Sequence, residues 1–277
     1  MRVTTRDVQE FKKKGQKFAV LTAYDYPTAK LVEEAGVPVI LVGDSLGQVV
    51  LGYDSTVQVT MEEMLHHTKA VVRGTKRAMV IGDMPFLSYN LDDAQALRNA
   101  GRFLQEAGAQ AVKLEGGVHV ANTVKRITEA GIPVMGHIGL TPQSVHQLGG
   151  YRVQGKTSAE AHELVEDALA LEAAGAFGVV LELIPASVAA TISQRLTIPT
   201  IGIGAGVGCD AQVQVVNDML GLTTDFVPKH AKRYATLGDA MREAIAAYAA
   251  EVQAGTFPTD KESFFTEDSI LKDIPQA

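Results

Sequence analysis

Short apolar runs alternate along this sequence with segments of helical length, and this alternation constrains the fold more than any other feature. The runs are rich in β-branched residues and lie at 18–23, 39–43, 79–82, 111–114, 134–136, 178–181, 200–203 and 213–216. They are apolar throughout, as expected for parallel strands that are covered on both faces. The segments of helical length lie at 26–34, 61–73, 91–106, 119–129, 159–173, 186–195 and 237–252. Eight strands separated mostly by helices predict an α/β fold.

Four similar corners between a helix and the following strand support this phasing. They are Glu34-Ala35-Gly36-Val37, Glu106-Ala107-Gly108-Ala109, Glu129-Ala130-Gly131-Ile132 and Ala173-Ala174-Gly175-Ala176, each with glycine where a left-handed helix cap is wanted. With 277 residues, the chain has the usual length of a single (β/α)₈ TIM barrel. We therefore predict such a barrel with a short N-terminal helix and a C-terminal tail. An open, doubly wound sheet is the alternative.

The domain organisation follows from the same pattern. We expect a catalytic barrel over residues 1–256 and an extended C-terminal tail over residues 257–277, which is polar and contains two prolines. Long loops at 44–60 and 138–157 follow the second and fifth strands, on the side where barrel enzymes carry their chemistry. Only a tight turn or a single helical turn fits between 203 and 213, so the seventh βα unit is expected to be degenerate.

Charge and cysteine content exclude several classes of protein. The formal net charge is −7, from 25 Lys and Arg against 32 Asp and Glu, which argues against a nucleic-acid partner. No apolar run approaches the roughly 18 residues of a membrane-spanning helix. The single cysteine, Cys209, cannot form an internal disulfide, and no apolar segment for secretion follows Met1. We therefore expect a cytoplasmic protein without a membrane partner.

Acidic residues stand where consecutive predicted strands end. Asp44, Asp83 and Glu115 follow the second, third and fourth strands, whose carboxyl ends meet at one mouth of a barrel. Carboxylates placed together repel one another unless they are protonated or share a cation, and oxygen ligands suit Mg²⁺. We expect Asp44 and Asp83 to bind Mg²⁺ directly and Glu115 to hold a metal-bound water. Taken singly, each aspartate has the alternative role of a helix N-cap.

Three further side chains share this mouth. Lys113 points the same way as Glu115, two residues on, and would either form a salt bridge or receive an anionic group of the substrate. Glu182 ends the sixth strand, away from the metal ligands, and suits a general base. His137 ends the fifth strand, either as a structural imidazole or as a ligand or hydrogen-bond donor.

A glycine-rich segment follows the seventh strand. Gly202-Ile203-Gly204-Ala205-Gly206 has the spacing GxGxG rather than GxGxxG, so a dinucleotide-binding fingerprint is not indicated. At the end of a barrel strand, these glycines would let a flat substrate or a phosphate approach the backbone.

Six segments in order resemble the motifs of the ketopantoate hydroxymethyltransferase family. They are Thr22-Ala23-Tyr24-Asp25, Val42-Gly43-Asp44-Ser45-Leu46-Gly47, Gly82-Asp83-Met84-Pro85-Phe86, Lys113-Leu114-Glu115-Gly116-Gly117, Gly136-His137-Ile138-Gly139-Leu140-Thr141-Pro142-Gln143 and Ile201-Gly202-Ile203-Gly204-Ala205-Gly206. The resemblance runs from about Thr4 to Pro258. It implies a barrel of the phosphoenolpyruvate mutase and isocitrate lyase superfamily.

The resemblance also implies an activity. The family transfers a hydroxymethyl group from 5,10-methylenetetrahydrofolate to 3-methyl-2-oxobutanoate through a Mg²⁺-stabilised enolate and gives 2-dehydropantoate (ketopantoate). This is the first committed step in the biosynthesis of pantothenate, the precursor of coenzyme A. The family members are homo-oligomers, often decamers, and one Mg²⁺ is expected per subunit.

Carried over by motif position, the family's site residues fall on the strand ends already singled out. Asp44, Asp83 and Glu115 would form the magnesium site, and Glu182 would accept the proton. Ser45 and Lys113 would contact the carboxylate of the substrate, which Asp44 and Asp83 also help to bind.

The sequence departs from the family pattern at three places. Glu182-Leu183-Ile184-Pro185 stands where Glu-x-Val-Pro is common, Ala211 where glycine is usual, and His230 where an aromatic residue is frequent. The first change keeps the acid, and the other two concern the contacts to the folate.

Two other functions are compatible with these residues. One is a related Mg²⁺-dependent lyase, but such lyases carry a cysteine acid in a Lys-Lys-Cys-Gly-His-like motif, and Cys209 lies in Val207-Gly208-Cys209-Asp210. The other is a non-catalytic barrel that senses 2-oxo acids, for which a complete set of metal ligands and a base would be unnecessary.

Overall fold

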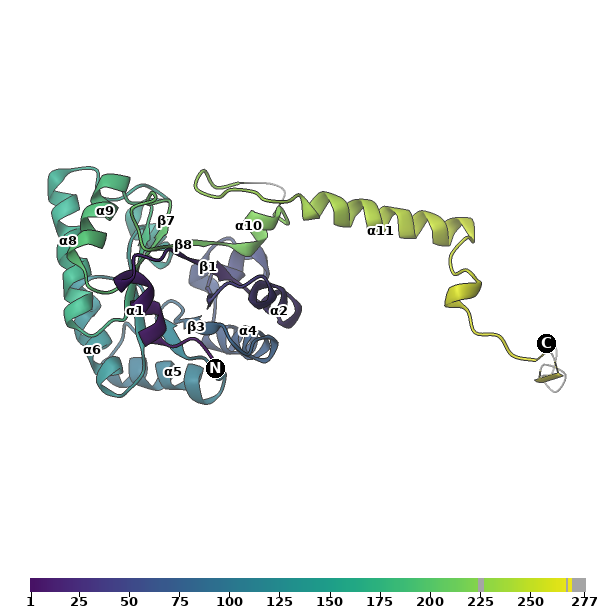
Figure 1. Ribbon diagram of the computed structural model, residues 1–277, viewed down its shortest axis with the longest axis horizontal. Coiled ribbons are helices and arrows are strands. Elements are labelled where there is room, and N and C mark those ends of the chain that lie inside the picture. Colours follow the sequence, from purple (N-terminus) through teal and green to yellow (C-terminus); the bar gives the residue numbers. More distant parts are fainter. Residues whose placement is uncertain (224–226, 268, 271–277) are drawn as a thin grey trace.

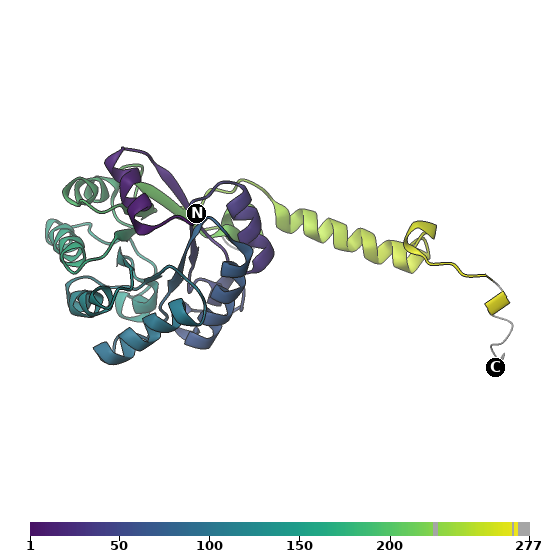
Figure 2. The ribbon, with the colours of Figure 1, turned by 60° about the horizontal axis from the view of Figure 1, so that its bottom comes forward.

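Eight parallel strands close into a barrel in the order in which they occur in the sequence (Figures 1 and 2). The structure is a computed structural model that describes residues 1–223, 227–267 and 269–270. The strands are β1 (Phe18–Thr22), β2 (Val39–Val42), β3 (Met79–Asp83), β4 (Ala111–Lys113), β5 (Val134–Gly139), β6 (Gly178–Glu182), β7 (Thr200–Ile203) and β8 (Ala211–Gln214). The predicted (β/α)₈ barrel is confirmed, because β8 pairs with β1 and leaves no open edge.

Helices surround the barrel and separate most of its strands (Figure 2). The α-helices are α1 (Thr5–Lys13), α2 (Tyr26–Glu34), α3 (Leu46–Val49), α4 (Met61–Gly74), α5 (Asp93–Gln105), α6 (Ala121–Glu129), α7 (Val145–Leu148), α8 (Ser158–Ala173), α9 (Ala186–Arg195), α10 (Val216–Leu220) and α11 (Leu237–Ala254). Short 3₁₀ helices are η1 (Thr56–Gln58), η2 (Val118–Val120), η3 (Pro142–Ser144) and η4 (Asp260–Glu262). The two long loops predicted after β2 and β5 thus contain α3 with η1, and η3 with α7.

Side chains of the strands alternate between the barrel interior and the surrounding helices. Residues such as Leu41, Ile81 and Val180 belong to an interior cluster of buried apolar side chains. Residues one position away face the helices, and there small size matters: a Cβ added at Gly82 would lie 2.3 Å from the ring of Phe103 on α5. This period of two fixes which strand residues reach the interior.

The seventh βα unit is degenerate, as predicted. Only a turn connects β7 to β8, and Asp210 within it accepts hydrogen bonds from the backbone nitrogen and the hydroxyl of Thr200. The predicted eighth strand at 213–216 is shifted, because β8 begins at Ala211, where pairing with Phe18 sets its register. Val216 instead begins α10, and its backbone nitrogen donates to Thr22 Oγ1.

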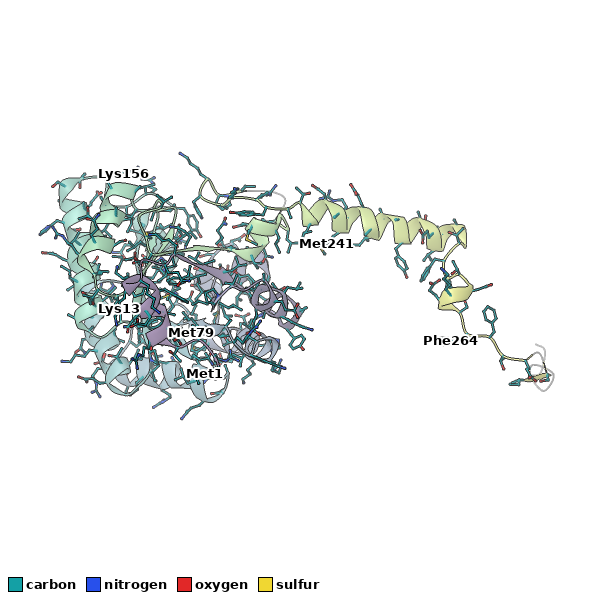
Figure 3. All side chains as sticks on the ribbon, viewed as in Figure 1. Met1, Lys13, Met79, Lys156, Met241 and Phe264 are labelled. Carbon is teal, nitrogen blue, oxygen red and sulfur yellow. The ribbon has the colours of Figure 1, made fainter. Side chains whose placement is uncertain are left out.

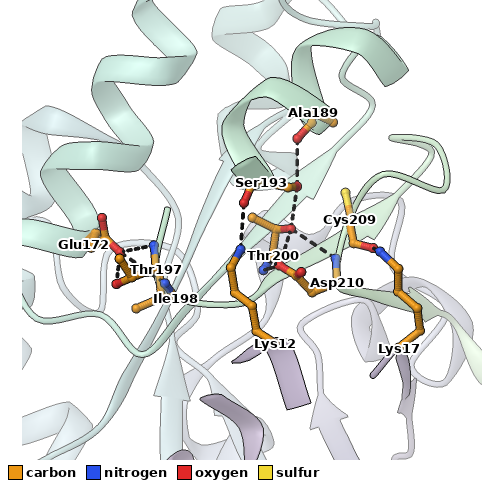
Figure 4. A network of polar contacts seen from close by, with 10 residues as sticks. All are labelled: Lys12, Lys17, Glu172, Ala189, Ser193, Thr197, Ile198, Thr200, Cys209 and Asp210. Carbon is orange, nitrogen blue, oxygen red and sulfur yellow. Dashed lines mark hydrogen bonds and ion pairs between the residues drawn. The ribbon is translucent and has the colours of Figure 1, made fainter. Parts of the chain in front are cut away.

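The predicted N-terminal helix, α1, closes the end of the barrel where the strands begin. Its Val8 is fully buried and belongs to the interior cluster. Lys12 Nζ lies 2.8 Å from Asp210 Oδ2 and 2.7 Å from the carbonyl oxygen of Ser193 (Figure 4). One lysine therefore joins α1 to α9 and to the turn before β8.

Helix α11 leaves the barrel and extends away from it, followed by the C-terminal segment (Figures 1 and 2). None of its residues is buried. The barrel itself is complete by the end of α10, so the predicted boundary between residues 256 and 257 does not mark a change in packing and stays a prediction. Residues 268 and 271–277 of the predicted tail lie outside the described residues.

No helix in the described ranges is both long enough and apolar enough to cross a membrane.

Replacing Lys12 by methionine should lower the free energy of unfolding by about 2 kcal/mol, because Asp210 loses a charged partner in a mostly buried setting. Lys13→Met is the matched control, because Lys13 pairs with Glu10 on the same helix but its side chain is 64% exposed. The control should change stability by less than about 0.5 kcal/mol. Urea denaturation followed by circular dichroism measures both. Equal losses for the two variants would contradict the role assigned to Lys12.

Candidate active site at the carboxyl ends of the strands

The period of two along the strands places ionisable side chains directly above the apolar interior. Asp83, Lys113, His137 and Glu182 each follow an interior residue by two positions, namely Ile81, Ala111, Met135 and Val180. All four therefore point into the same mouth of the barrel. Asp44 and Glu115 lie just beyond β2 and β4 and are buried there as well.

Lys113 is buried among carboxylates. Its Nζ lies 2.8 Å from Asp83 Oδ1 and 3.9 Å from Glu115 Oε1. Burial opposes a charged ammonium, but the negative charges of Asp83, Glu115 and Asp44 outweigh it and raise the pKa of Lys113. The lysine is therefore a fixed positive charge at the floor of the mouth. Of the two roles considered for it, the salt bridge is present.

His137 lies between two glutamates from neighbouring strands. Its Nδ1 lies 3.5 Å from Glu115 Oε1 and its Nε2 lies 3.2 Å from Glu182 Oε2. Burial and the nearby Lys113 lower its pKa, but the two glutamates outweigh them and raise the pKa of His137 to about 9. Burial likewise acts on Glu115, yet His137 and Lys113 hold the pKa of that carboxyl below its usual value. The imidazole ring therefore lies between the carboxylates of Glu115 and Glu182 and keeps them apart.

Asp44 and Asp83 approach each other across neighbouring strands. The backbone nitrogen of Asp44 donates to Asp83 Oδ2 at 3.1 Å. Burial, followed by the charges of Asp83 and Glu115, raises the pKa of Asp44 well above its usual value. Burial also raises the pKa of Asp83, although Lys113 opposes this shift. The electrostatics of the mouth therefore favour an additional positive charge near these two aspartates.

Neither Asp44 nor Asp83 caps a helix. Ser45 is the N-cap residue of α3 and Asp92 that of α5. Among the strand-end aspartates, Asp25 has this role, because its side chain accepts from the backbone nitrogen of Thr28 at the start of α2.

Gln143, in the loop after β5, is a site residue that reasoning from the sequence missed. Its Nε2 donates to Asp44 Oδ2 at 2.8 Å and to the carbonyl oxygen of Met84 at 3.0 Å. Its backbone nitrogen donates to Glu115 Oε2 at 3.0 Å. One residue thus orients two acids from different strands. The only signal was its place in the segment from Gly136 to Gln143.

Tyr89, in the loop after β3, was missed as well. Its hydroxyl donates to Gln143 Oε1 at 2.8 Å and accepts from the backbone nitrogen of Glu115 at 3.1 Å. Ser45 has a comparable partner, because its Oγ lies 2.8 Å from the hydroxyl of Tyr24 at the end of β1. The spacing of residues in the sequence does not predict the contacts of Tyr89 and Ser45, because the loops bring these residues to their partners only in the folded chain.

The backbone at Glu182 is held by close packing on both sides. Leu183, the next residue, has φ of 46°, a left-handed conformation that is strained for a side chain of this kind. Its backbone nitrogen donates to the carbonyl oxygen of Ile203 on β7. On the other side, a Cβ added at Gly139 would lie 2.2 Å from the carbonyl oxygen of Glu182. The direction of the Glu182 side chain is therefore fixed by two neighbouring strands.

The glycine-rich segment after β7 does not form the open cradle that we expected for a flat substrate or a phosphate. A Cβ at Gly204 would lie 2.6 Å from Leu183 Cδ2 and 3.0 Å from His230 Cβ. A Cβ at Gly206 would lie 2.5 Å from that of Ala186. The glycines are needed because other parts of the chain already fill this space.

The donors at the mouth fit a hard divalent cation in charge and chemistry. Among the residues that the structure describes, no three His, Cys, Asp or Glu side chains already converge as the ligands of one metal ion. The mouth nevertheless gathers the carboxylates of Asp44, Asp83, Glu115 and Glu182 around Lys113 and His137. With all six charged, two negative charges remain in excess. Carboxylate oxygens are the ligands that Mg²⁺ prefers.

The fold and the mouth together define a (β/α)₈ barrel with acid–base groups at the carboxyl ends of its strands, the arrangement of barrel enzymes. Residues 2–260 match the family model described as ketopantoate hydroxymethyltransferase. The chain is 64% identical over 274 residues to "3-methyl-2-oxobutanoate hydroxymethyltransferase" of Dehalococcoides mccartyi strain CBDB1, covering 99% of this chain and 98% of that protein. It is 60% identical over 263 residues to the protein of the same name from Chloroflexus aurantiacus strain J-10-fl, covering 95% and 93%.

The chain therefore belongs to the ketopantoate hydroxymethyltransferase family, a family of transferases. Solved structures share the fold at much lower identity. Phosphonopyruvate hydrolase is 13% identical with a TM-score of 0.61, covering 98% of this chain and 94% of that one. The enzyme 2,3-dimethylmalate lyase, described as a member of the PEP mutase/isocitrate lyase superfamily, is 16% identical with a TM-score of 0.59, covering 98% and 95%.

Proposed function

We propose that this protein transfers a hydroxymethyl group from 5,10-methylenetetrahydrofolate to 3-methyl-2-oxobutanoate and forms 2-dehydropantoate for pantothenate biosynthesis. The observation that carries the proposal is the identity of 64% over 99% of the chain to the 3-methyl-2-oxobutanoate hydroxymethyltransferase of Dehalococcoides mccartyi strain CBDB1. The chemistry of the mouth agrees with it. The reaction of a 2-oxo acid requires a positive charge for its carboxylate, oxygen ligands for a metal ion and a base for the proton at C3, and the mouth contains side chains of each kind.

Lys113 and Ser45 are the proposed contacts of the substrate's carboxylate. Lys113 supplies a buried positive charge, and the Ser45 hydroxyl, held by Tyr24, supplies a hydrogen-bond donor. Asp44 and Asp83 lie beside them and would hold Mg²⁺, one ion per subunit, while Glu115 would hold a metal-bound water. A divalent cation held there would supply the positive charge that favours loss of the C3 proton of a 2-oxo acid.

Glu182 is the proposed general base. It is held 3.2 Å from His137 Nε2 and its side chain is 14% exposed, so the carboxylate is oriented and still accessible from the mouth. It would take the proton from C3 of the substrate, and His137 would steady the carboxylate as an accessory group. The C3 carbon would then bond to the methylene carbon of the folate, and water would supply the hydroxyl oxygen of the product. Both carbon–nitrogen bonds of that methylene group would break, and tetrahydrofolate would leave with one proton from C3 and one from the water.

The lyase alternative requires a cysteine acid at the mouth. Cys209 is buried just before β8 begins, at the opposite end of the barrel from Glu182. Burial also raises the pKa of its thiol, which opposes thiolate chemistry. A buried thiol suits a reducing compartment, and we propose the cytoplasm.

The protein is also proposed to form a homo-oligomer, a decamer by resemblance to its family. Helix α11 carries exposed apolar residues at spacings of three and four, which form one stripe on a helix. They are Leu237, Met241, Ile245, Tyr248 and Val252. Figure 3 shows Met241 and, further along, Phe264 on the segment that extends from the barrel. A helix with such a stripe gains little stability alone, so we propose that a second copy of the chain covers it.

Asp44→Ala and Asp83→Ala should each abolish the Mg²⁺-dependent binding of 3-methyl-2-oxobutanoate, because each removes an oxygen ligand from a site with few protein ligands. Glu115→Gln should weaken binding less, because it holds the ion through water. Isothermal titration calorimetry with and without Mg²⁺ measures all three variants. Normal binding of metal and substrate by the double variant Asp44→Ala/Asp83→Ala would show that the metal lies elsewhere.

The proton transfer can be observed without any folate. In D₂O with Mg²⁺, the protein should exchange the C3 proton of 3-methyl-2-oxobutanoate, which NMR detects, and chelating the metal should stop the exchange. Glu182→Gln keeps the shape of the side chain but loses the base, so exchange should fall on the order of 10²-fold or more. Glu166→Gln on the exposed face of α8 is the control. Exchange at the wild-type rate in Glu182→Gln would remove Glu182 from the mechanism.

Ile245→Glu should reduce the size of the oligomer, because it places a charge in the middle of the apolar stripe of α11. Ala250→Glu adds the same charge to the opposite face of the same helix and should leave the oligomer intact. Size-exclusion chromatography with light scattering gives the mass of each variant. An unchanged mass for Ile245→Glu would show that this stripe is not the contact between subunits.

A further inference from the structure

A cavity lies between the two long loops that follow β2 and β5. Its volume is about 350 Å³, and its lining includes Asp54, Val145, His146, Tyr151 and the pair Gly149-Gly150. Binding pockets for small molecules have volumes of this order. None of these residues has a role in the chemistry proposed for Glu182 or the metal.

Gln48 connects this cavity to the mouth of the barrel. It belongs to α3, which begins directly after Asp44 and Ser45. Its Nε2 lies 3.4 Å from the Tyr151 hydroxyl and donates to the carbonyl oxygen of Asp54 at 3.3 Å. Burial raises the pKa of Tyr151, and the negative charges of Asp44, Glu182 and Glu115 also raise it. Because α3 starts directly after Ser45, a ligand in the cavity would lie beside the 2-oxo acid that Ser45 is proposed to contact.

The lining suits a flat ring. Tyr151 offers an aromatic wall on which a heteroaromatic ring can stack. Gly149 and Gly150 have φ of 67° and 111°, and a Cβ added at either would meet no atom within 4 Å. The backbone at these glycines is therefore open to close approach by a planar group.

Asp54 adds a specific polar group to this slot. Its side chain is exposed, and no ion pair or hydrogen bond to its carboxylate is found within the described ranges. A carboxylate has two oxygens side by side and pairs best with two neighbouring N–H groups. The pterin ring of a reduced folate presents this edge, formed by N3–H and the 2-amino group.

We propose that this cavity binds the pterin ring of tetrahydrofolate, with Tyr151 stacked on the ring and Asp54 paired with its N3–H and 2-amino edge. The inference rests on the proposed function, which requires a folate beside the 2-oxo acid. It assigns the folate to the side of the mouth next to α3, where Gln48 contacts both the Tyr151 hydroxyl and the carbonyl oxygen of Asp54.

Titration of tetrahydrofolate into the full-length protein, saturated with Mg²⁺ and 3-methyl-2-oxobutanoate, tests the assignment. Asp54→Asn and Tyr151→Ala should each weaken binding about tenfold or more, whereas Tyr151→Phe, which keeps the ring, should change it less than about threefold. Glu163→Gln, an exposed acid on α8, is the matched control and should bind as the wild type does. The KM for the folate should rise in Asp54→Asn and Tyr151→Ala, while the KM for the 2-oxo acid changes less than about twofold.

A folate analogue that lacks the 2-amino group makes the test specific. Loss of this group should cost the wild type about tenfold in affinity but Asp54→Asn less than about threefold, because the pairing partner is already absent. Wild-type affinity for tetrahydrofolate in both Asp54→Asn and Tyr151→Ala would overturn the assignment and leave the proposed function standing. Absence of both tetrahydrofolate binding and turnover in the wild type would overturn the proposed function, and the inference with it.

Discussion

The ion pair between Lys113 and Asp83 makes the rest of the mouth possible. Four carboxylates lie close together above an apolar core, and burial of such groups without partners is strongly unfavourable. The lysine, 2.8 Å from Asp83, offsets part of this cost, and His137 between Glu115 and Glu182 offsets another part. Asp44 is left with the least compensation, since Gln143 offers it only a neutral amide. The charge that is missing from the protein is the charge that a divalent cation would bring.

The barrel and the positions of the acids were predictable because both follow from the period of the strands. An interior residue such as Ile81 fixes the direction of Asp83 two positions later, whatever the loops do. The same rule places Lys113 above Ala111 and Glu182 above Val180. The start of β8 was misjudged because the apolar run at 213–216 continues into α10, whereas pairing with β1 selects Ala211.

Contacts made by loops and helix faces were not predictable in this way. Gln143 and Tyr89 reach the acids from two different loops, and only the folded chain shows that their side chains meet. The glycines after β7 looked like an opening for a ligand, because a sequence does not show whether Leu183 fills the space beside them. Helix α11 has the apolar stripe of a helix that packs on its own barrel, yet the structure directs it away. The spacing of apolar residues along a helix shows that one face is apolar, but it does not show which surface packs against that face.

The strained residue Leu183 connects the base to the loop that borders the proposed folate cavity. Its backbone nitrogen donates to Ile203 on β7, and its carbonyl oxygen accepts from the backbone nitrogen of Gln154 in the loop after β5. That loop also carries Tyr151, three residues before Gln154. A left-handed leucine costs of the order of 1 kcal/mol, which must be offset by these contacts. The strained residue therefore lies next to Glu182, and its backbone groups bond both to β7 and to the loop that carries Tyr151.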